Sequence, residues 1–288
     1  MPAAGEFTLR GKRAVLATMH GKERALAPLL VGGLGLDVRL PAGLDTDRFG
    51  TFSREIARPG SQLDAARAKI AAGFEHDGEA SVAIASEGGF GPHPALPFVA
   101  LGREIVVLQD RSTGLELIGH HDDLQPAFAH AAADGPEAAL AFAARIGFPA
   151  QGLIVIGLAS GVPDPAAYLC KDIESADALA AAVRAAVTQC GAAHLETDMR
   201  AHRNPARMRA IRRAGIDLVR RYRSPCPACA RPGFAVTERV AGLPCSWCGS
   251  PTQATRARAS VCPSCGWRVE EAVAATTADP GECEHCNP

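Results

Sequence analysis

Four Cys-x-x-Cys pairs fall within the last 63 residues of this 288-residue chain. They take eight of its ten cysteines, and intervals of 15, 13 and 17 residues separate Cys226/Cys229, Cys245/Cys248, Cys262/Cys265 and Cys283/Cys286. Each Cys-x-x-Cys turn can present two thiolates to one ion, so the four pairs predict two tetrahedral Cys₄ zinc sites. Disulfides or redox catalysis are the competing interpretations.

Spacing alone does not decide which cysteines bind the same ion. We favour neighbouring pairs, with one ion held by Cys226, Cys229, Cys245 and Cys248, and the second by Cys262, Cys265, Cys283 and Cys286. An interleaved arrangement fits the same spacing.

The amino-terminal residues lack the basic start and continuous apolar run of a signal peptide. We therefore expect a cytoplasmic protein, in which thiols stay reduced and such cysteine pairs bind metal. No apolar stretch reaches the roughly 18 residues of a membrane span, so we expect no membrane association.

Lys22 is the first polar residue of interest outside the cysteine pairs. It follows an expected strand that ends near Thr18, and it opens an expected helix. Helix N-terminal amides and a nearby ammonium group form a natural anion site. The alternative is that Lys22 is a solvated residue in the first turn of the helix.

Asp64 has two interpretations. It follows Ser61 by three residues, which is the spacing of a capping box at a helix N-terminus. Its carboxylate could instead serve Mg²⁺ as a hard oxygen ligand.

Glu87 is followed by Gly88 and Gly89, directly after an expected buried strand at residues 82–86. Ligand-binding groups of α/β sheets lie at the carboxyl ends of strands, and glycines allow a ligand to approach the backbone closely. The sequence therefore favours a functional carboxylate over an ordinary loop residue.

Residues 194–207 carry an unusual density of polar groups. Glu196 and Asp198 share one face of an expected strand, and Arg200, His202, Arg203 and Arg207 follow it. Arginine forks of this kind could bind phosphate or a base edge. A structural network of ion pairs is an equal alternative.

Strand-like and helix-like segments alternate through the first 223 residues, which predicts an α/β domain with a mixed sheet. We expect strands near residues 14–18, 82–86, 104–110, 115–120, 153–158 and 194–198, and helices near 22–34, 61–73, 136–147, 175–189 and from 205 onward. The sequence Ser224-Pro225 ends the last helix. The expected domains are therefore residues 1–223 and a small zinc-ribbon module at residues 224–288, which depends on metal for its folding.

The charge distribution indicates which kinds of partner the chain could bind. The net charge is −1, so the chain as a whole is no electrostatic binder of nucleic acid. Nine arginines and one acidic residue nevertheless lie between Met199 and Ser224. Residues 200–288 could therefore contact nucleic acid or a protein partner.

The segments above, in this order, resemble the house-cleaning nucleoside triphosphate pyrophosphatases of the inosine/xanthosine triphosphatase group. Residues 16–22 are similar to that group's opening strand and phosphate-binding lysine, and residues 62–69 to its magnesium-binding motif. Residues 85–89 resemble its third motif, whose acidic residue serves the metal or the attacking water, and residues 200–203 resemble its base-contacting His-Arg element. The resemblance spans residues 13–215.

The resemblance implies a mixed-sheet, nucleotide-pyrophosphatase-like fold and a Mg²⁺-dependent hydrolase of a nucleoside triphosphate or related nucleotide. Lys22, Asp64 and Glu87 would then be catalytic, and the residues that contact substrate would be Thr18, Gly88, Gly89, Arg200, His202 and Arg203. Met19 stands where the group usually has asparagine, and residues 157–172 do not reproduce its late glycine-rich loop. The whole chain also resembles an uncharacterised bacterial family that joins such a domain to four Cys-x-x-Cys pairs.

Two other functions compete with hydrolysis. In one, the α/β domain has lost catalysis and the arginine-rich helix and zinc ribbons bind nucleic acid or protein. In the other, the zinc module only fixes the chain end and assists formation of a homodimer.

Overall fold

The computed structural model describes residues 6–50, 56, 58 and 60–288, which form two compact units. One unit is Leu9–Val219; the other joins the amino-terminal residues up to Thr8 to Arg220–Pro288. The predicted boundary after Arg223 falls four residues beyond this division. Among the described residues, no helix is long and apolar enough to cross a membrane.

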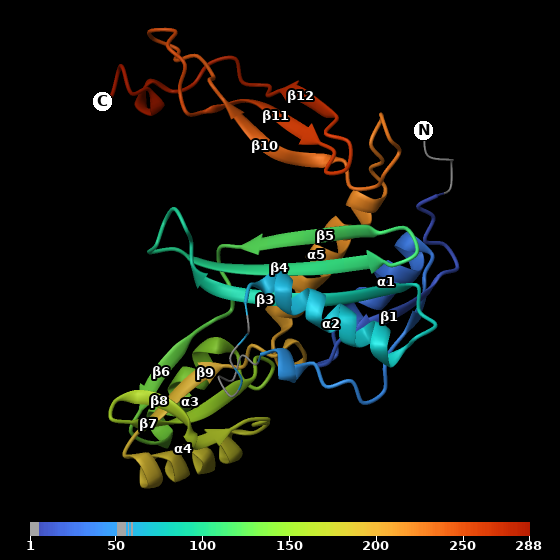
Figure 1. Ribbon diagram of the computed structural model, residues 1–288. Helices are drawn as coiled ribbons and strands as arrows, with labels where there is room; N and C mark the ends of the chain where they lie inside the picture. Colours follow the sequence, from blue (N-terminus) through green and yellow to red (C-terminus); the bar gives the residue numbers. More distant parts are fainter. Residues whose placement is uncertain (1–5, 51–55, 57, 59) are drawn as a thin grey trace. The chain divides into compact units, whose positions relative to one another are not determined.

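The larger unit contains a five-stranded mixed sheet in the order β2-β1-β3-β4-β5 (Figure 1). The strands β1, β2 and β3 are parallel, whereas β3, β4 and β5 are antiparallel. Their bounds are β1 Arg13–Ala17, β2 Asp37–Arg39, β3 Val82–Pro92, β4 Ala100–Asp110 and β5 Leu115–Asp123.

Helices cover both faces of this sheet. Helix α2 (Gln62–His76) packs on one face, where Ala66 and Ile70 meet alternate residues of β1, β3 and β4. Helix α5 (Pro205–Tyr222) lies behind the sheet in Figure 1, and its Gly215 packs on Leu26 of α1 (Glu23–Leu34). The chain therefore passes from β1 through α1 to β2, and then through α2 to β3 on the other side of β1.

This connectivity makes the carboxyl edge between β1 and β3 a topological switch point, the place where open α/β sheets bind ligands. The parallel pairing of β1 with β3 ends at Ala17 opposite Ala85. The β1–α1 turn and the next residues of β3 therefore meet at this edge.

A second, antiparallel sheet of four strands has the order β6-β9-β7-β8. Helices α3 (Pro136–Ile146) and α4 (Ala176–Cys190) pack on one face of it through alanine, leucine and valine side chains. The strands are β6 His130–Ala133, β7 Leu153–Ala159, β8 Val162–Cys170 and β9 Ala193–Thr197.

The smaller unit contains a three-stranded antiparallel sheet in the order β10-β11-β12. Its strands are β10 Ala235–Ala241, β11 Thr255–Val261 and β12 Arg268–Ala272. A short 3₁₀ turn of this unit lies at Pro280–Glu282, and two such turns of the larger unit lie at Asp47–Phe49 and Ala201–Arg203.

The structure confirms the mixed α/β class and the positions of the expected elements, with two important differences. The expected strands do not share one mixed sheet, because those at residues 153–159 and 193–197 pair in the separate antiparallel sheet. Residues 82–86 do not form a complete strand, because β3 continues to Pro92 and pairs with β4 throughout. Glu87, Gly88 and Gly89 are thus strand residues and not a loop. Antiparallel pairing with β4 supplies backbone partners that the apolar pattern alone does not reveal. The expectations also omitted β2, β6 and β8, which are short or half-exposed.

Candidate functional site

A small pocket of about 30 Å³ lies at the β1/β3 edge. Five cationic side chains and two carboxylates contribute to its lining, which comprises Met19, His20, Lys22, Thr46, Asp47, Gly50, Lys69, Glu87, Lys171, Arg200 and Arg207. Its charge is strongly positive for its size, so the chemistry that suits it is anion binding.

Lys22 occupies the N-cap position of α1 and is only 6% exposed. Its Nζ donates a hydrogen bond to the carbonyl of Ser86, 3.1 Å away. Burial, reinforced by the positive charges of Arg207 and Lys69, lowers the pKa of Lys22 to about 7. The strand-to-helix turn thus brings an ammonium group and the N-terminus of a twelve-residue helix to the same edge.

Glu87 lies on the α2 face of β3, where Lys69 Nζ approaches its Oε1 to 3.1 Å. Arg58 Nε lies 3.8 Å from the same oxygen. Burial by itself disfavours the carboxylate, but Lys69, Lys22 and Arg58 together lower the pKa of Glu87 below its usual value. Glu87 is therefore an ionised, buried carboxylate in a positive environment.

A second buried ion pair lies on the opposite face of the β3–β4 ribbon. Arg207 Nε donates to Glu104 Oε1 over 2.7 Å, and both side chains are about 2% exposed. A Cβ at Gly88 would lie 2.6 Å from each partner, so only glycine leaves room for the pair. Gly88 thus serves packing of this ion pair, whereas a Cβ at Gly89 would make only ordinary contacts with Gln62.

Arg200 also lines the pocket, and carboxylates hold it in place. Its guanidinium contacts Asp198 at 2.7 Å and Asp172 at 2.8 Å. His202 stacks on His20 with ring centroids 5.1 Å apart. Burial lowers the pKa of both histidines, so both are mostly neutral near pH 7.

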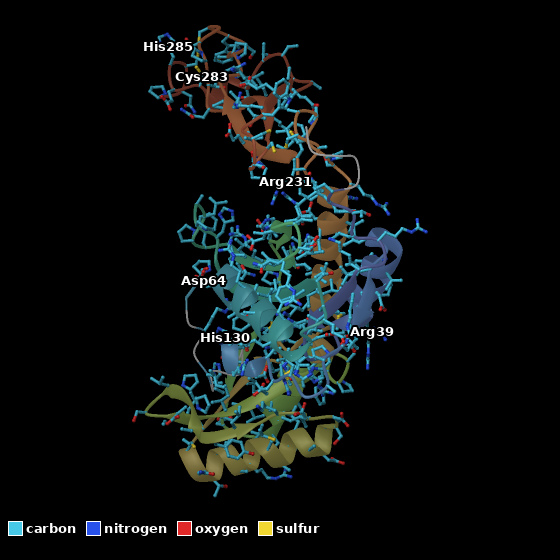
Figure 2. All side chains as sticks on the ribbon, turned by 45° about the vertical axis from the view of Figure 1, so that its right-hand side comes forward. Arg39, Asp64, His130, Arg231, Cys283 and His285 are labelled. Atoms are coloured by element: carbon cyan, nitrogen blue, oxygen red, sulfur yellow. The ribbon has the colours of Figure 1, made fainter. Side chains whose placement is uncertain are left out.

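Other predicted residues lie outside the pocket lining. Asp64 completes the capping box with Ser61 that the sequence predicted, and its exposed side chain caps α2 (Figure 2). Hydrogen bonds from Ser61 lower the pKa of Asp64. Arg203 donates to the Ile173 carbonyl, and Thr18 Oγ1 donates to the Met19 carbonyl. Lys22, Glu87 and Arg200 therefore meet at one edge, whereas the structure does not bring Asp64 to them.

Sequence reasoning gave no role to Lys69 or Glu104, whereas it placed Arg207 in the cluster of cationic residues that follows residue 198. A signal for Lys69 was available: it falls on the buried stripe of α2, between Ala66 and Ile70, where an apolar residue is expected. Glu104 directly precedes the apolar run of β4 at residues 105–108 and is buried with it. Their partners come from distant segments, so the pairs themselves had no local signal.

In the described part of the chain, groups of at least three close Cys, His, Asp or Glu side chains occur only as two tetracysteine clusters. We name them cluster 1 (Cys226, Cys229, Cys262, Cys265) and cluster 2 (Cys245, Cys248, Cys283, Cys286). The expectation of neighbouring pairs is therefore wrong, and the arrangement is interleaved. Carboxylates form no such group there.

The sulfur spacing in both clusters suits a tetrahedral ion. The closest Sγ–Sγ distances across the pairs are 3.7 and 3.6 Å in cluster 1, and 3.9 and 3.6 Å in cluster 2. Four sulfurs about 2.3 Å from one zinc ion would be about 3.8 Å apart. A disulfide would require about 2.05 Å. The clusters could therefore bind two structural zinc ions.

Each Cys-x-x-Cys pair sits in a similar tight turn. The backbone amides of Ala230, Gly249, Gly266 and Asn287 donate to the carbonyl of the first cysteine of their pair, at 2.8–3.0 Å. Gly249 and Gly266 adopt positive φ angles, as does Ala230. This turn points both sulfurs in one direction, so each pair supplies two of the four sulfurs of a cluster.

The sheet explains why the clusters interleave. Seven-residue β10 carries the chain away from Cys229 by about 23 Å before it reaches Cys245. Strand β11 returns antiparallel and places Cys262 beside the start of β10, and β12 leads away again toward Cys283. The first and third pairs thus share one end of the sheet, and the second and fourth share the other.

The profile of a family described as "Domain of unknown function (DUF6671)" matches residues 69–288. The chain belongs to this family. The DUF6671 match contains Lys69, Glu87, Arg207 and both tetracysteine clusters, whereas Lys22 precedes it. A search of curated proteins found no match.

Among solved structures, the chain is similar to the crystal structure of protein VC0702 from Vibrio cholerae. The sequence identity is 8% and the TM-score 0.28, over 48% of this chain and 69% of that chain. We draw neither fold nor function from a similarity this low.

Proposed function

We propose that the pocket at the β1/β3 edge binds the phosphate groups of a nucleoside triphosphate or related nucleotide, and that this DUF6671 protein hydrolyses it with Mg²⁺. The proposal includes the finer fold assignment, a nucleotide-pyrophosphatase-like domain followed by a zinc-ribbon module. One observation carries it: Lys22 is a buried lysine, and the only hydrogen bond of its Nζ among the described residues goes to a carbonyl.

The neighbouring charges explain why an anion would bind there. Lys69 is paired with Glu87, Arg207 with Glu104, and Arg200 with Asp198, so each of these cations has a carboxylate in contact. Lys22 has none within hydrogen-bonding distance in the described structure. A phosphate group beside Lys22 would supply the missing negative charge, and the amides at the start of α1 would add donors.

Hydrolysis would use Glu87 as the carboxylate of the site. Mg²⁺ is commonly held by one or two carboxylates together with substrate phosphates, so a preformed acidic cluster is not required. Glu87 would orient the attacking water or the ion, while Lys22, Lys69 and Arg207 neutralise charge on the phosphates. Positioning and charge neutralisation supply most of the rate in such reactions.

Asp64 has a smaller role in this proposal than the resemblance implies. Its carboxylate already accepts the backbone and hydroxyl hydrogen bonds of Ser61. It therefore serves the position of α2, and so the position of Lys69 on that helix.

The test is a screen of nucleoside triphosphates with Mg²⁺, which measures release of pyrophosphate and phosphate. We expect Glu87→Gln to abolish Mg²⁺-dependent hydrolysis. Glu116→Gln is a matched control. It removes the charge of another glutamate that forms an ion pair with α2, in this case with Arg67, and it lies outside the pocket. Full activity of folded Glu87→Gln, or no hydrolysis of any nucleotide by the wild type, would refute the catalytic proposal.

A second candidate function is binding of single-stranded nucleic acid by the cysteine-rich unit. Both tryptophans of the chain lie in this unit, Trp247 inside the second Cys-x-x-Cys pair and Trp267 two residues after the third, and they are 79% and 49% exposed. Exposed aromatic rings on zinc modules can stack on unpaired bases. Retention on single-stranded nucleic acid that weakens with salt and is lost in Trp247→Ala would support this function, and no retention at low salt would reject it.

A further inference from the structure

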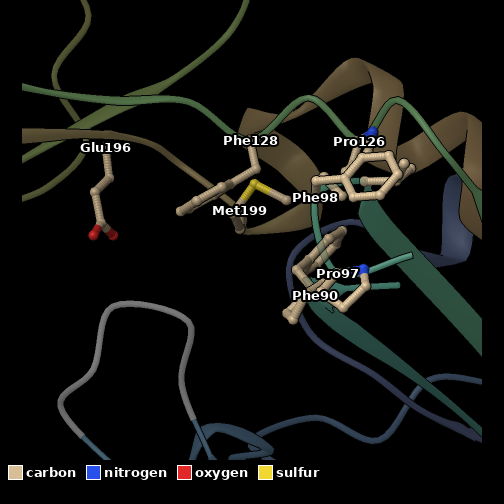
Figure 3. Close-up of a pocket in the computed structure, with 11 residues that line it drawn as sticks. Phe90, Pro97, Phe98, Pro126, Phe128, Glu196 and Met199 are labelled. Carbon is tan, nitrogen blue, oxygen red and sulfur yellow. The ribbon is translucent and has the colours of Figure 1, made fainter. Parts of the chain in front are cut away.

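A second pocket, of about 500 Å³, lies in the larger unit and has a different character. Figure 3 shows aromatic and proline side chains on one side and the Glu196 carboxylate on another. Its apolar walls come from the distal end of β3, the connection to β4, and the segments before β6 and after β9. The side chains that define it are Phe90, Phe98, Phe128, Met199 and Glu196.

Two of these rings are unusually accessible for phenylalanine. Phe98 is 87% exposed and Phe128 is 42% exposed. Aromatic side chains left in contact with water around a concave space commonly mark a binding site. Glu196 contrasts with them, because it is only 3% exposed and accepts a hydrogen bond from His194 at 2.9 Å.

One side chain connects this apolar pocket to the cationic pocket. Arg207 lines the cationic pocket, and its guanidinium lies 5.6 Å from the ring centroid of Phe90. Arg207 also donates to the carbonyl of Met199, which lines the apolar pocket. Glu87 and Phe90 belong one to each pocket. They lie three residues apart on β3, so their side chains point to opposite faces of the strand, about 10 Å apart along it.

We infer that the apolar pocket binds the heterocyclic base of the nucleotide whose phosphates occupy the cationic pocket, an inference that rests on the proposed function. The phenylalanine rings offer stacking surfaces, and the Glu196 carboxylate accepts hydrogen bonds from ring N–H groups. Guanine carries two adjacent N–H donors on its Watson–Crick edge, whereas adenine carries a single donor beside an acceptor. The pocket therefore favours guanine over adenine.

This inference differs from the expectation drawn from the sequence, which placed base contacts at Arg200, His202 and Arg203. Asp198 and Asp172 already hold Arg200, and the Ile173 carbonyl holds Arg203. Phe98 and Phe128, in contrast, present open ring surface.

The experiment is calorimetric titration of the full chain without added Mg²⁺, so that no ligand is hydrolysed, with GTP, ATP, tripolyphosphate and guanosine as ligands. We expect GTP to bind about tenfold or more tightly than tripolyphosphate, since stacking on each ring is commonly worth that factor. The variant Phe98→Ala/Phe128→Ala should lose this advantage with tripolyphosphate binding unchanged. Glu196→Gln should reduce the preference for GTP over ATP. Leu140→Ala, an exposed apolar residue of α3 outside both pockets, is the control and should change nothing.

The outcomes separate the two proposals. Equal affinity for GTP and tripolyphosphate would overturn the base site and leave the phosphate site standing. Saturable guanosine binding that the double variant abolishes, with no binding of tripolyphosphate, would uphold the base site and overturn the phosphate site. If light scattering shows a dimer that Phe98→Ala separates into monomers, the pocket is an interface between two copies and the base site is refuted.

Discussion

The two units of this protein contrast in what holds them together. In Leu9–Val219, leucine, isoleucine, valine and alanine side chains fill two apolar cores between helices and sheets. In the described part of the unit that contains Arg220–Pro288, the buried apolar residues besides cysteine are Pro232, Leu243, Ala257, Ala259 and Ala278. So small an apolar core is not expected to offset the entropy of ordering about 70 residues, and metal bound by the two clusters could supply the difference.

The contrast extends to charge. The larger unit buries ionised side chains in pairs, such as Glu87 with Lys69 and Glu104 with Arg207. Ion pairs of the smaller unit, such as Arg268 with Glu238, lie at its exposed surface, where each contributes little. Buried charges therefore serve the candidate site of the larger unit, whereas thiolates serve the fold of the smaller one.

Removal of metal should have the largest effect among the tests of this contrast. A zinc chelator should unfold residues 220–288 and leave 9–219 folded, because only the smaller unit depends on the clusters. Hydrogen exchange read region by region measures both outcomes. Loss of protection in both units together would contradict the division.

Single cysteine variants sharpen the same test. Cys226→Ser and Cys262→Ser should each halve the zinc content from two ions to one, and they should release the same ion, because both residues belong to cluster 1. Cys170→Ser lies outside both clusters and should retain two ions. If Cys226→Ser and Cys245→Ser released the same ion, these two cysteines would share a site and the neighbouring arrangement would be correct.

The buried Glu104–Arg207 pair should show the next largest effect. Glu104→Ala leaves the Arg207 charge buried without its partner, which typically costs about 3–5 kcal/mol. Urea unfolding of the larger unit measures this loss. The double change Glu104→Leu/Arg207→Met removes both charges and should recover most of the stability; no recovery would mean that the pair is not the cause.

The pKa of Lys22 predicts a pH effect on anion binding. Because burial lowers this pKa to about 7, Lys22 loses most of its charge between about pH 6 and 8, and sulfate affinity should fall across that range. Sulfate itself does not titrate there, and the pKa values of His20 and His202 are lowered from 6.5, so both histidines are mostly neutral in the upper half of the range. Titrations at several pH values measure the effect, and Lys22→Met should flatten the profile. An unchanged profile in that variant would remove Lys22 from the anion site.

The same pKa has a consequence for stability. The unfolded chain keeps a proton on Lys22 up to about pH 10.5, but the folded chain releases it near pH 7. The unfolded state therefore binds more protons between these values, and the contribution of Lys22 makes the free energy of unfolding rise with pH across this window.

The smallest expected effect concerns Asp64. Ser61→Ala should cost about 1 kcal/mol through loss of the α2 cap, and Asp64→Ala should destabilise in the same direction. Neither change should alter how hydrolysis depends on Mg²⁺. A higher Mg²⁺ requirement in Asp64→Ala alone would return Asp64 to the metal site.

Much of the fold was predictable because its signals are local. The capping box at Ser61 and the apolar periods of the helices depend on neighbours within a few residues, and the structure confirms them. The length of β3 was not predictable in this way, because its last six residues are held by pairing with β4 and not by an apolar pattern. Of the candidate site, the sequence indicated Lys22, Glu87 and Arg207 but not Lys69 or Glu104. The partners in the two buried ion pairs lie 18 and 103 residues apart.

The amino-acid sequence alone determined that eight cysteines would form four turns, each able to present two thiolates to a metal ion, since a Cys-x-x-Cys turn is shaped by consecutive residues and their backbone hydrogen bonds. Only the tertiary structure decided which pairs meet, because the lengths and directions of β10, β11 and β12 set the ends of the sheet at which each turn lies. The same holds for Lys22. Its residue type and its position at the start of a helix follow from the sequence. Its burial among other cations depends on strands and helices from distant parts of the larger unit.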